Sequence, residues 1–237
     1  MSKVWFKSFS FSRYTSSGRS PSTCVWVLLP VLLCTCGPAL EEHDETDELG
    51  YRTEYTTSPE SGQREGAARR YDAEGRLRTE ENYVRGQLDG TRTAYYPDGK
   101  VELVENYRDG RFEGEYLTYD SLGNMRLRGL YVDGTMARQW TRYYPSGSVR
   151  EVVTFADNKE NGPFREWYEN GAPHYAGTYV NGKEEGTVFA FDEGGALVAI
   201  RECETGVCHT VWRPTDGTPA PAQAPDMTRP PGVDATQ

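Results

Sequence analysis

The sequence contains few of the residues on which catalysis and metal binding most often depend. It has three histidines and five cysteines among 237 residues, and only 36% of its residues are hydrophobic. This low hydrophobic content, together with 25 glycines and 16 tyrosines, disfavours a helical bundle or a doubly wound sheet and favours β structure in one modest domain. The net charge of -10 argues against a protein that binds nucleic acid or an anionic bilayer by charge, because both need a basic surface.

A hydrophobic run long enough to span a bilayer is missing from the N-terminal region. The run from Val25 to Leu33 has nine residues and includes Pro30, whereas a transmembrane helix needs roughly twenty apolar residues. Before it, residues 1–23 carry four basic residues and no acidic one. Basic residues followed by a short apolar run are typical of a secretory signal, and we expect residues 1–35 to be a signal peptide.

The residues after the apolar run resemble a bacterial lipobox. They read Leu33, Cys34, Thr35, Cys36, Gly37, with a leucine three residues before the second cysteine and a small residue directly before it. The resemblance implies that Cys36 is acylated and becomes the mature N-terminus, and Gly37 after it implies sorting to the outer membrane. Cleavage before Cys34, or an ordinary signal peptide without a lipid, remains an alternative.

The remaining cysteines and the next residues suggest an exported protein. If Cys36 is acylated, only Cys203 and Cys208 remain, and in an oxidising envelope we expect them to form a disulfide. A metal site with His209 would be one ligand short of a structural zinc centre. Residues 41–48 contain six acidic residues in eight. Since such a run repels itself, we expect residues 36–49 to form an extended acidic tether.

Residues 66–209 divide into six blocks of 24 residues without an insertion. Counted from zero at the start of each block, position five is aromatic in all six, position nine is always glycine, and position twenty is glycine or asparagine. These residues are Tyr71, Tyr95, Tyr119, Tyr143, Trp167 and Phe191; Gly75, Gly99, Gly123, Gly147, Gly171 and Gly195; and Gly86, Gly110, Gly134, Asn158, Gly182 and Gly206. Such regularity indicates a repeat protein.

The two glycine positions predict two turns in each block. Segments such as Tyr96-Pro97-Asp98-Gly99 suit a type I turn that ends in a left-handed residue, and Asp109-Gly110 is a strong signal for a two-residue hairpin turn. The runs between the turns have strand length. We therefore predict an all-β fold, an elongated single-sheet antiparallel meander of six 24-residue β-hairpins.

Aromatic residues are expected on both faces of this sheet. Positions five, eleven and seventeen should stack along one face. The opposite face carries a second set, of which we select Trp140, Tyr144, Phe164 and Tyr168 as candidate binding residues, because an exposed apolar surface usually has a function. Such rings can dock a protein partner or stack on sugars of the cell wall; they can also serve simply as the core of a one-layer sheet.

The repeat resembles a known family. Tyr107, Gly110 and Gly114, followed by Tyr119 and Gly123, resemble a MORN repeat, most closely the bacterial variant found in secreted and lipid-anchored proteins and named the YwqK-type antitoxin family. The resemblance implies a scaffold that binds a protein partner without chemistry of its own; an antitoxin-like protein that neutralises a toxin is an alternative. A second resemblance, to the YD repeats of toxin-encasing shells, is weaker because six units are too few to close a shell.

The whole chain can then be divided into five segments. After the signal peptide and the tether, we expect a degenerate half-repeat at residues 50–65, a MORN-like repeat domain with a C-terminal cap at 66–213, and a disordered proline-rich tail at 214–237. No catalytic residue, cofactor or metal is expected. The interpretation is a bacterial cell-envelope protein, on the outer membrane, that contacts the membrane only through its N-terminal lipid.

Overall fold

The structure, a computed structural model, describes residues 39–220 and 222–227. The signal peptide and Cys36 lie outside these residues. All described secondary structure belongs to the compact unit that begins at Leu40. The described residues include no helix that is long and apolar enough to cross a membrane.

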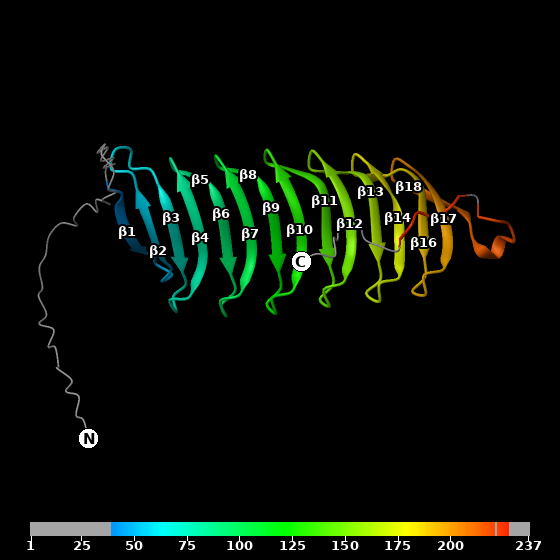
Figure 1. Cartoon of the computed structure of the whole chain (residues 1–237), viewed down its shortest axis with the longest axis horizontal. Helices are drawn as coiled ribbons and strands as arrows, with labels where there is room; N and C mark the ends of the chain where they lie inside the picture. The colour runs from blue at the N-terminus through cyan, green and yellow to red at the C-terminus, as the bar shows by residue number, and fades with distance from the viewer. Residues whose placement is uncertain (1–38, 221, 228–237) are drawn as a thin grey trace, which may run out of the picture. The chain divides into compact units, whose positions relative to one another are not determined.

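The described chain forms one open antiparallel sheet, in which the long strands pair in the order of the sequence (Figure 1). The two-residue strands β5, β8 and β15 pair with the strand before each of them. This confirms the predicted meander. Its strands are β1 (Glu41–Thr46), β2 (Arg52–Thr57), β3 (Gly66–Tyr71), β4 (Leu77–Val84), β5 (Gln87–Leu88), β6 (Gly90–Tyr95), β7 (Val101–Arg108), β8 (Arg111–Phe112), β9 (Gly114–Tyr119), β10 (Met125–Val132), β11 (Thr135–Tyr143), β12 (Val149–Ala156), β13 (Lys159–Trp167), β14 (Pro173–Val180), β15 (Lys183–Glu184), β16 (Gly186–Phe191), β17 (Leu197–Glu204) and β18 (Val207–Trp212), followed by a 3-10 turn, η1 (Pro214–Asp216).

The turns form where the glycine pattern predicts them. In the first turn of a block, the N–H of Gly99 donates to the carbonyl of Tyr96 at 2.9 Å, and Gly99 has a φ of 85°. In the second turn both central residues have positive φ, as Asp109 and Gly110 do at 47° and 75°. This is the geometry of a type I′ hairpin turn. Asn158 also has positive φ, at 63°, as expected for the residue that replaces glycine there.

The predicted arrangement of the two faces is wrong, because a β-bulge occurs in every block. On β12, for example, Glu151 lies opposite Arg142 but Val149 lies opposite Tyr143, which leaves Arg150 as an extra residue. The same register shift occurs beside position five in the other five blocks. Because one added residue reverses the alternation of side chains, positions five and eleven share one face, while position seventeen lies on the other face with position two.

The buried core is concentrated in the C-terminal half of the sheet and lies on both faces. One cluster consists of Val152, Trp167, Ala176, Phe189, Phe191, Ile200 and Met227, and the other of Val153, Phe164, Val188 and Cys203. We call the face of the first cluster the covered face. The opposite face carries positions two, fifteen and seventeen of the blocks, for example Phe164, Val153 and Cys203. We call it the ladder face.

The covered face is named for the C-terminal segment that lies on it. Trp167 Nε1 donates a hydrogen bond to the carbonyl of Met227 at 3.1 Å, and the Met227 side chain is 8% exposed. Ala222 and Ala224 pack against the same cluster, so the chain turns back from the last strand toward β13 (Figure 1). This differs from the disordered tail expected for residues 214–237, because burial against Trp167 orders the part up to Met227; residues 228–237 lie outside the description.

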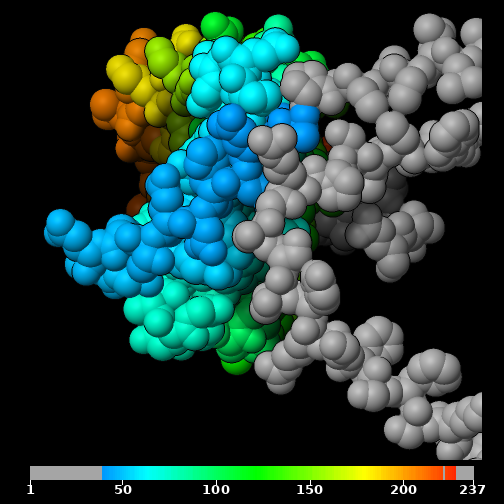
Figure 2. Space-filling view, turned by 90° about the vertical axis from the view of Figure 1, so that its left-hand side faces the viewer, coloured from blue at the N-terminus to red at the C-terminus, as the bar shows by residue number. Residues whose placement is uncertain are grey.

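The acidic segment also differs from its expected form. Part of the expected tether, Glu41–Thr46, is strand β1, and it pairs along its whole length with β2 from the expected half-repeat. Side chains across the pair offset the repulsion between the acids: Arg52 lies 3.5 Å from Asp44, and the Tyr55 hydroxyl donates to Glu45 at 2.8 Å. Figure 2 shows these first strands, in blue, at the end of the sheet.

Candidate binding surface on the ladder face

Aromatic rings form a continuous row across the middle of the ladder face. The centroid distances along this row are 4.7 Å from Tyr107 to Phe112 and 4.7 Å from Phe112 to Tyr131. The row continues with 5.2 Å from Tyr131 to Trp140 and 5.9 Å from Trp140 to Phe155. These distances are typical of stacked and edge-to-face aromatic pairs, so the row stabilises the sheet between β7 and β12.

The four candidate binding residues do not form an exposed aromatic surface. Trp140 and Phe164 are buried on the ladder face, at 4% and 2% exposure. The hydroxyls of Tyr144 and Tyr168 donate to the carbonyls of Trp167 at 2.9 Å and Phe191 at 3.1 Å, each one repeat further along the chain. The four residues therefore contribute to packing and to contacts between repeats. The expectation that exposed rings stack on sugars loses its basis, because two of these rings are in the core.

Two glycines at position fifteen explain this burial. Gly177 lies directly opposite Phe164, and a Cβ added there would lie 2.7 Å from Phe164 Cε1. A Cβ at Gly129 would collide with the Trp140 ring in the same way. The missing side chains allow both rings to lie flat on the neighbouring strand. The signal was present in the sequence, as glycine at one position of two blocks only, but sequence reasoning did not use it.

A small recess opens beside Trp140 on this face. Its volume is about 80 Å³. The lining includes three rings and three charged side chains beside aliphatic residues: Trp140, Phe155, Tyr179, Arg142, Glu151 and Glu160, with Leu127, Met136 and Val153. Trp140 Nε1 is buried and has no hydrogen-bond partner among the described residues. A buried donor without an acceptor costs about 1–3 kcal/mol. A molecule in the recess that supplied an acceptor to this donor would remove an unfavourable term, provided that neighbouring side chains move enough to expose the buried nitrogen.

Carboxylates gather around this recess. Glu151 forms an ion pair with Arg142 at 2.6 Å and lies directly opposite Glu166 on the next strand. Burial, and then the charge of Glu151, raise the pKa of Glu166. Burial and the neighbouring glutamates, first among them Glu184, raise the pKa of Tyr179 to about 12. Tyr179 is therefore a neutral phenol at physiological pH, with negative charge around it.

In the N-terminal half the same face holds cations of the chain itself. Arg92, at position two, forms ion pairs with Glu81 at 2.9 Å and Glu105 at 2.7 Å. The Arg64 guanidinium lies 4.5 Å from the ring centroid of Tyr55 and 5.2 Å from that of Tyr83. The ladder face can thus bind guanidinium groups both through carboxylates and through tyrosine rings.

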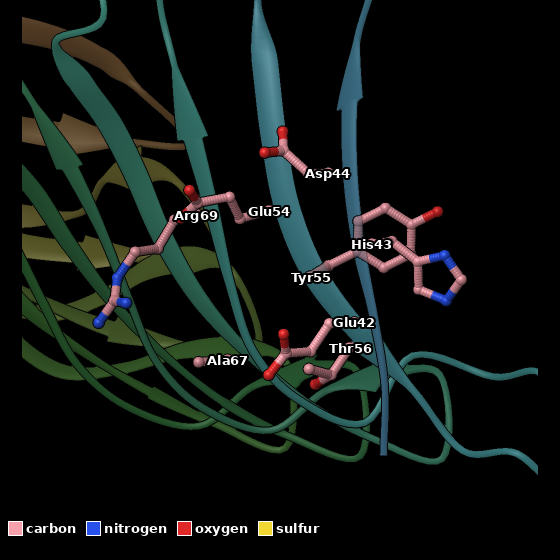
Figure 3. A pocket seen from close by; sticks show the side chains of 8 residues that line it. All are labelled: Glu42, His43, Asp44, Glu54, Tyr55, Thr56, Ala67 and Arg69. Carbon is pink, nitrogen blue, oxygen red and sulfur yellow. The ribbon is translucent and has the colours of Figure 1, made fainter. Parts of the chain in front are cut away.

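A larger recess, of a different lining, lies at the N-terminal end, between β1, β2 and β3 (Figure 3). Its volume is about 530 Å³, and its polar lining includes the rings of His43 and Tyr55, which stack at 4.7 Å. His43 Nε2 lies 2.8 Å from Thr57 Oγ1, and Arg69 is paired with Glu80 at 2.9 Å. Because these groups already contact each other, this recess is a weaker candidate than the one beside Trp140.

The last hairpin contains the predicted disulfide. Cys203 and Cys208 are bonded to each other and lie opposite one another on β17 and β18. Glu184 Oε2 lies 3.0 Å from Cys208 Sγ, and these three residues form a compact cluster of potential metal ligands. Since both sulfur atoms are used in the disulfide, this cluster lacks the thiolates that a metal ion would need. His209, the third ligand that we considered, is not part of it.

Comparison with known proteins supports the repeat assignment. Residues 88–109 and 160–181 match the family described as MORN repeat variant, and the two matches begin 72 residues apart, which is three repeats of 24. No curated protein matches the chain. A solved structure of a GtfA/B complex bound to UDP and GlcNAc is similar at 14% identity and a TM-score of 0.20, over 69% of this chain and 28% of that one. A porin-like protein from Bacteroides uniformis ATCC 8492 is similar at 11% identity and a TM-score of 0.19, over 72% of this chain and 92% of that one.

This chain thus spans only 28% of the length of the first of these structures, and similarity at such TM-scores supports no conclusion about function. The two sequence matches are more informative. Each one begins two residues before a block starts and ends in the second turn of that block, so both follow the register of the hairpins. The chain is a repeat β-sheet protein in which two segments match the MORN repeat variant.

Proposed function

We propose that this protein is a non-enzymatic scaffold of the bacterial cell envelope, anchored by a lipid on Cys36, that binds a protein partner through the ladder face. One observation carries the proposal. The chain's own C-terminal segment occupies part of the covered face, whereas the ladder face has a recess with a buried, unsatisfied donor at Trp140. The match to the MORN repeat variant agrees with a binding role for the sheet.

The placement of the histidines supports binding rather than acid–base chemistry. His43 lies on β1, His174 on β14 and His209 on β18, so His43 is more than ten strands from the other two, and β16 and β17 lie between β14 and β18. In the N-terminal half of the ladder face, the carboxylates of Glu81 and Glu105 are engaged in ion pairs with Arg92. These contacts stabilise the sheet and suit a rigid binding surface.

The anchoring part of the proposal rests on the lipobox-like residues before Gly37. Mass spectrometry of the protein purified from bacterial membranes should find a mature N-terminus at Cys36 that carries acyl chains. A Cys36→Ser variant should leave the membrane fraction. A mature chain that begins elsewhere and carries no lipid would contradict the anchoring.

The binding part can be tested by site-specific photocross-linking in cells. A photoreactive residue at Thr118, which lies in the same transverse row of the ladder face as Arg142 and Glu151, should give one discrete protein adduct that mass spectrometry can identify. The matched control is the same residue at Asp98, in a hairpin turn. If neither position gives an adduct, or both give the same mixture, the ladder face is not the binding surface.

A further inference from the structure

The recess beside Trp140 is small enough to define what can enter it. Its volume of about 80 Å³ corresponds to roughly three water molecules in the liquid. That space admits the planar end group of one side chain but not a sugar ring or an element of secondary structure. Because rings of Trp140, Phe155 and Tyr179 contribute to its lining, a flat group could stack on an aromatic wall.

The charge around the recess is negative and incompletely balanced. Four carboxylates act on the hydroxyl of Tyr179: Glu151, Glu160, Glu166 and Glu184. Glu151 is paired with Arg142, and Glu166 lies 3.4 Å from His174 Nδ1. Within the described part of the chain, Glu160 and Glu184 form no ion pair, so this end of the ladder face favours a group that brings positive charge.

The N-terminal half shows which cation this surface accommodates. Tyr83 and Tyr179 are equivalent residues, both at position seventeen of their blocks, and Arg64 and Glu160 are equivalent because each lies nineteen residues before its tyrosine. Arg64, just before the first block, lies over the Tyr83 ring, and its Nη1 donates to the Tyr83 hydroxyl at 3.3 Å. At the end of the fourth block the carboxylate of Glu160 replaces that arginine, so the ring of Tyr179 has an acid beside it where Tyr83 has a guanidinium.

The hydrogen-bond donor at Trp140 without a partner further restricts which class of ligand fits the recess. Trp140 Nε1 needs an acceptor, and neither a bare metal ion nor an isolated guanidinium provides one. A peptide provides both partners, because a cationic side chain can meet the carboxylates while a backbone carbonyl nearby accepts from the indole. A sugar would supply acceptors but no positive charge, and its ring would exceed the recess.

We infer that the recess lined by Trp140, Tyr179 and Glu160 binds an arginine side chain of the protein partner. The guanidinium would stack on the Tyr179 ring and donate to Glu160, and the peptide backbone would accept from Trp140 Nε1 after a small movement that exposes this atom. This inference rests on the proposed scaffold function and adds to it the chemistry of the partner. Arginine suits the site better than lysine because its planar fork both stacks on rings and pairs with carboxylates.

The probe for this inference is the peptide acetyl-Gly-Gly-Arg-Gly-Gly-amide. The control is the same peptide with citrulline, which is uncharged, in place of arginine. Both peptides are titrated into the full-length protein in detergent, with ¹⁵N-labelled tryptophan observed by NMR. We expect the arginine peptide to shift one indole N–H signal in a saturable manner, and the citrulline peptide to bind about tenfold more weakly, because it lacks the charge that strengthens the hydrogen bonds.

Variants then locate the site. Glu160→Gln keeps the shape of the recess and should weaken arginine-peptide binding about tenfold. Glu193→Gln removes the same charge at an exposed turn and should leave binding unchanged. The inference is overturned if the two peptides bind equally well, if neither binds, or if Glu160→Gln binds the arginine peptide like the unchanged protein.

The same variant separates this inference from the proposed function. The photoreactive residue at Thr118 is combined with Glu160→Gln. A partner adduct that persists while the arginine peptide fails to bind removes the arginine site and leaves the scaffold function intact. Loss of the adduct with Glu160→Gln, but not with Glu193→Gln, supports both the arginine site and the scaffold function. Absence of any adduct in the protein without Glu160→Gln contradicts the scaffold function itself.

Discussion

The two halves of the sheet share one backbone repeat but fill the ladder face differently. In the N-terminal half, position two is Arg92, held between Glu81 and Glu105 at position fifteen. In the fourth and fifth blocks, position two is an aromatic ring, Trp140 and Phe164, and Phe164 faces Gly177 at position fifteen. Ion pairs and hydrogen bonds thus replace ring packing at equivalent sites.

This difference shows that hairpin turns and bulges alone define the repeat, while its side-chain layer can vary. The same turn with two positive φ residues occurs in both halves, at Asp109 and Gly110 and at Asn181 and Gly182. The buried clusters, in contrast, draw all their residues from β12 onward. We therefore expect the C-terminal half to hold most of the stability, because burial of apolar area is the larger favourable term.

The largest effect should come from removing a ring of the C-terminal half. Phe164→Ala would leave a cavity above Gly177 at a site that is 2% exposed, and we expect a loss of about 3–5 kcal/mol in the free energy of unfolding. Urea denaturation followed by circular dichroism measures it. A loss below about 1 kcal/mol would mean that the ladder face is not a true core.

The equivalent change in the N-terminal half should cost less. Arg92→Ala leaves Glu81 and Glu105 facing each other without their cation, and we expect a loss of about 2 kcal/mol, because Arg92 is partly exposed. The matched control combines Arg92→Met with Glu81→Gln and Glu105→Gln and should lie within about 1 kcal/mol of the unchanged protein. If Arg92→Ala proves as costly as Phe164→Ala, the proposed contrast between the halves fails.

The disulfide should have a smaller, local effect. Cys203→Ser together with Cys208→Ser opens the loop at the end of the sheet, and we expect a loss of about 2 kcal/mol. Hydrogen exchange should become faster mainly in β17 and β18, because β18 has only one neighbouring strand in the described structure. Hydrogen exchange that accelerates equally in β3 and β4 would show that the disulfide stabilises the whole sheet.

The smallest effect is an opposite response of the halves to pH. The hydrogen bond from Arg69, and then that from Tyr95, lower the pKa of Glu80 below 4.5, so its contribution to stability is present above 4.5 and lost as the pH falls through the lowered pKa. Burial and Glu151 raise the pKa of Glu166 above 4.5, so its contribution is present below 4.5 and lost as the pH rises through the raised pKa.

Acidification from neutral pH should therefore first strengthen β13 and then, below 4.5, weaken β4. Hydrogen exchange resolved by residue, measured above and below that pH, tests both steps. Glu166→Gln is the control, since it should remove the first step and leave the second unchanged. A uniform response of both strands would mean that these carboxyl groups do not govern local stability.

Much of the fold could be predicted because its signals are local. The turn glycines, the single asparagine at position twenty and the pairing of Cys203 with Cys208 all follow from the residues themselves, since few residues adopt positive φ and two cysteines across a short turn are close. The exposure of the candidate binding residues was predicted wrongly for a different reason. The exposure of Trp140 depends on Gly129, which lies on another strand and was not recognised as its partner.

The sequence by itself determined the number of hairpins between residues 66 and 209, their length and their order along the sheet, because turn chemistry is decided by neighbouring residues. Only the tertiary structure decided which face each ring occupies, since one bulge residue per block reverses the alternation. It also decided that Glu41–Thr46 joins the sheet and that Met227 returns to Trp167. These last contacts join segments far apart in the chain or depend on a facing strand, and a repeat pattern carries no information about partners outside the repeat.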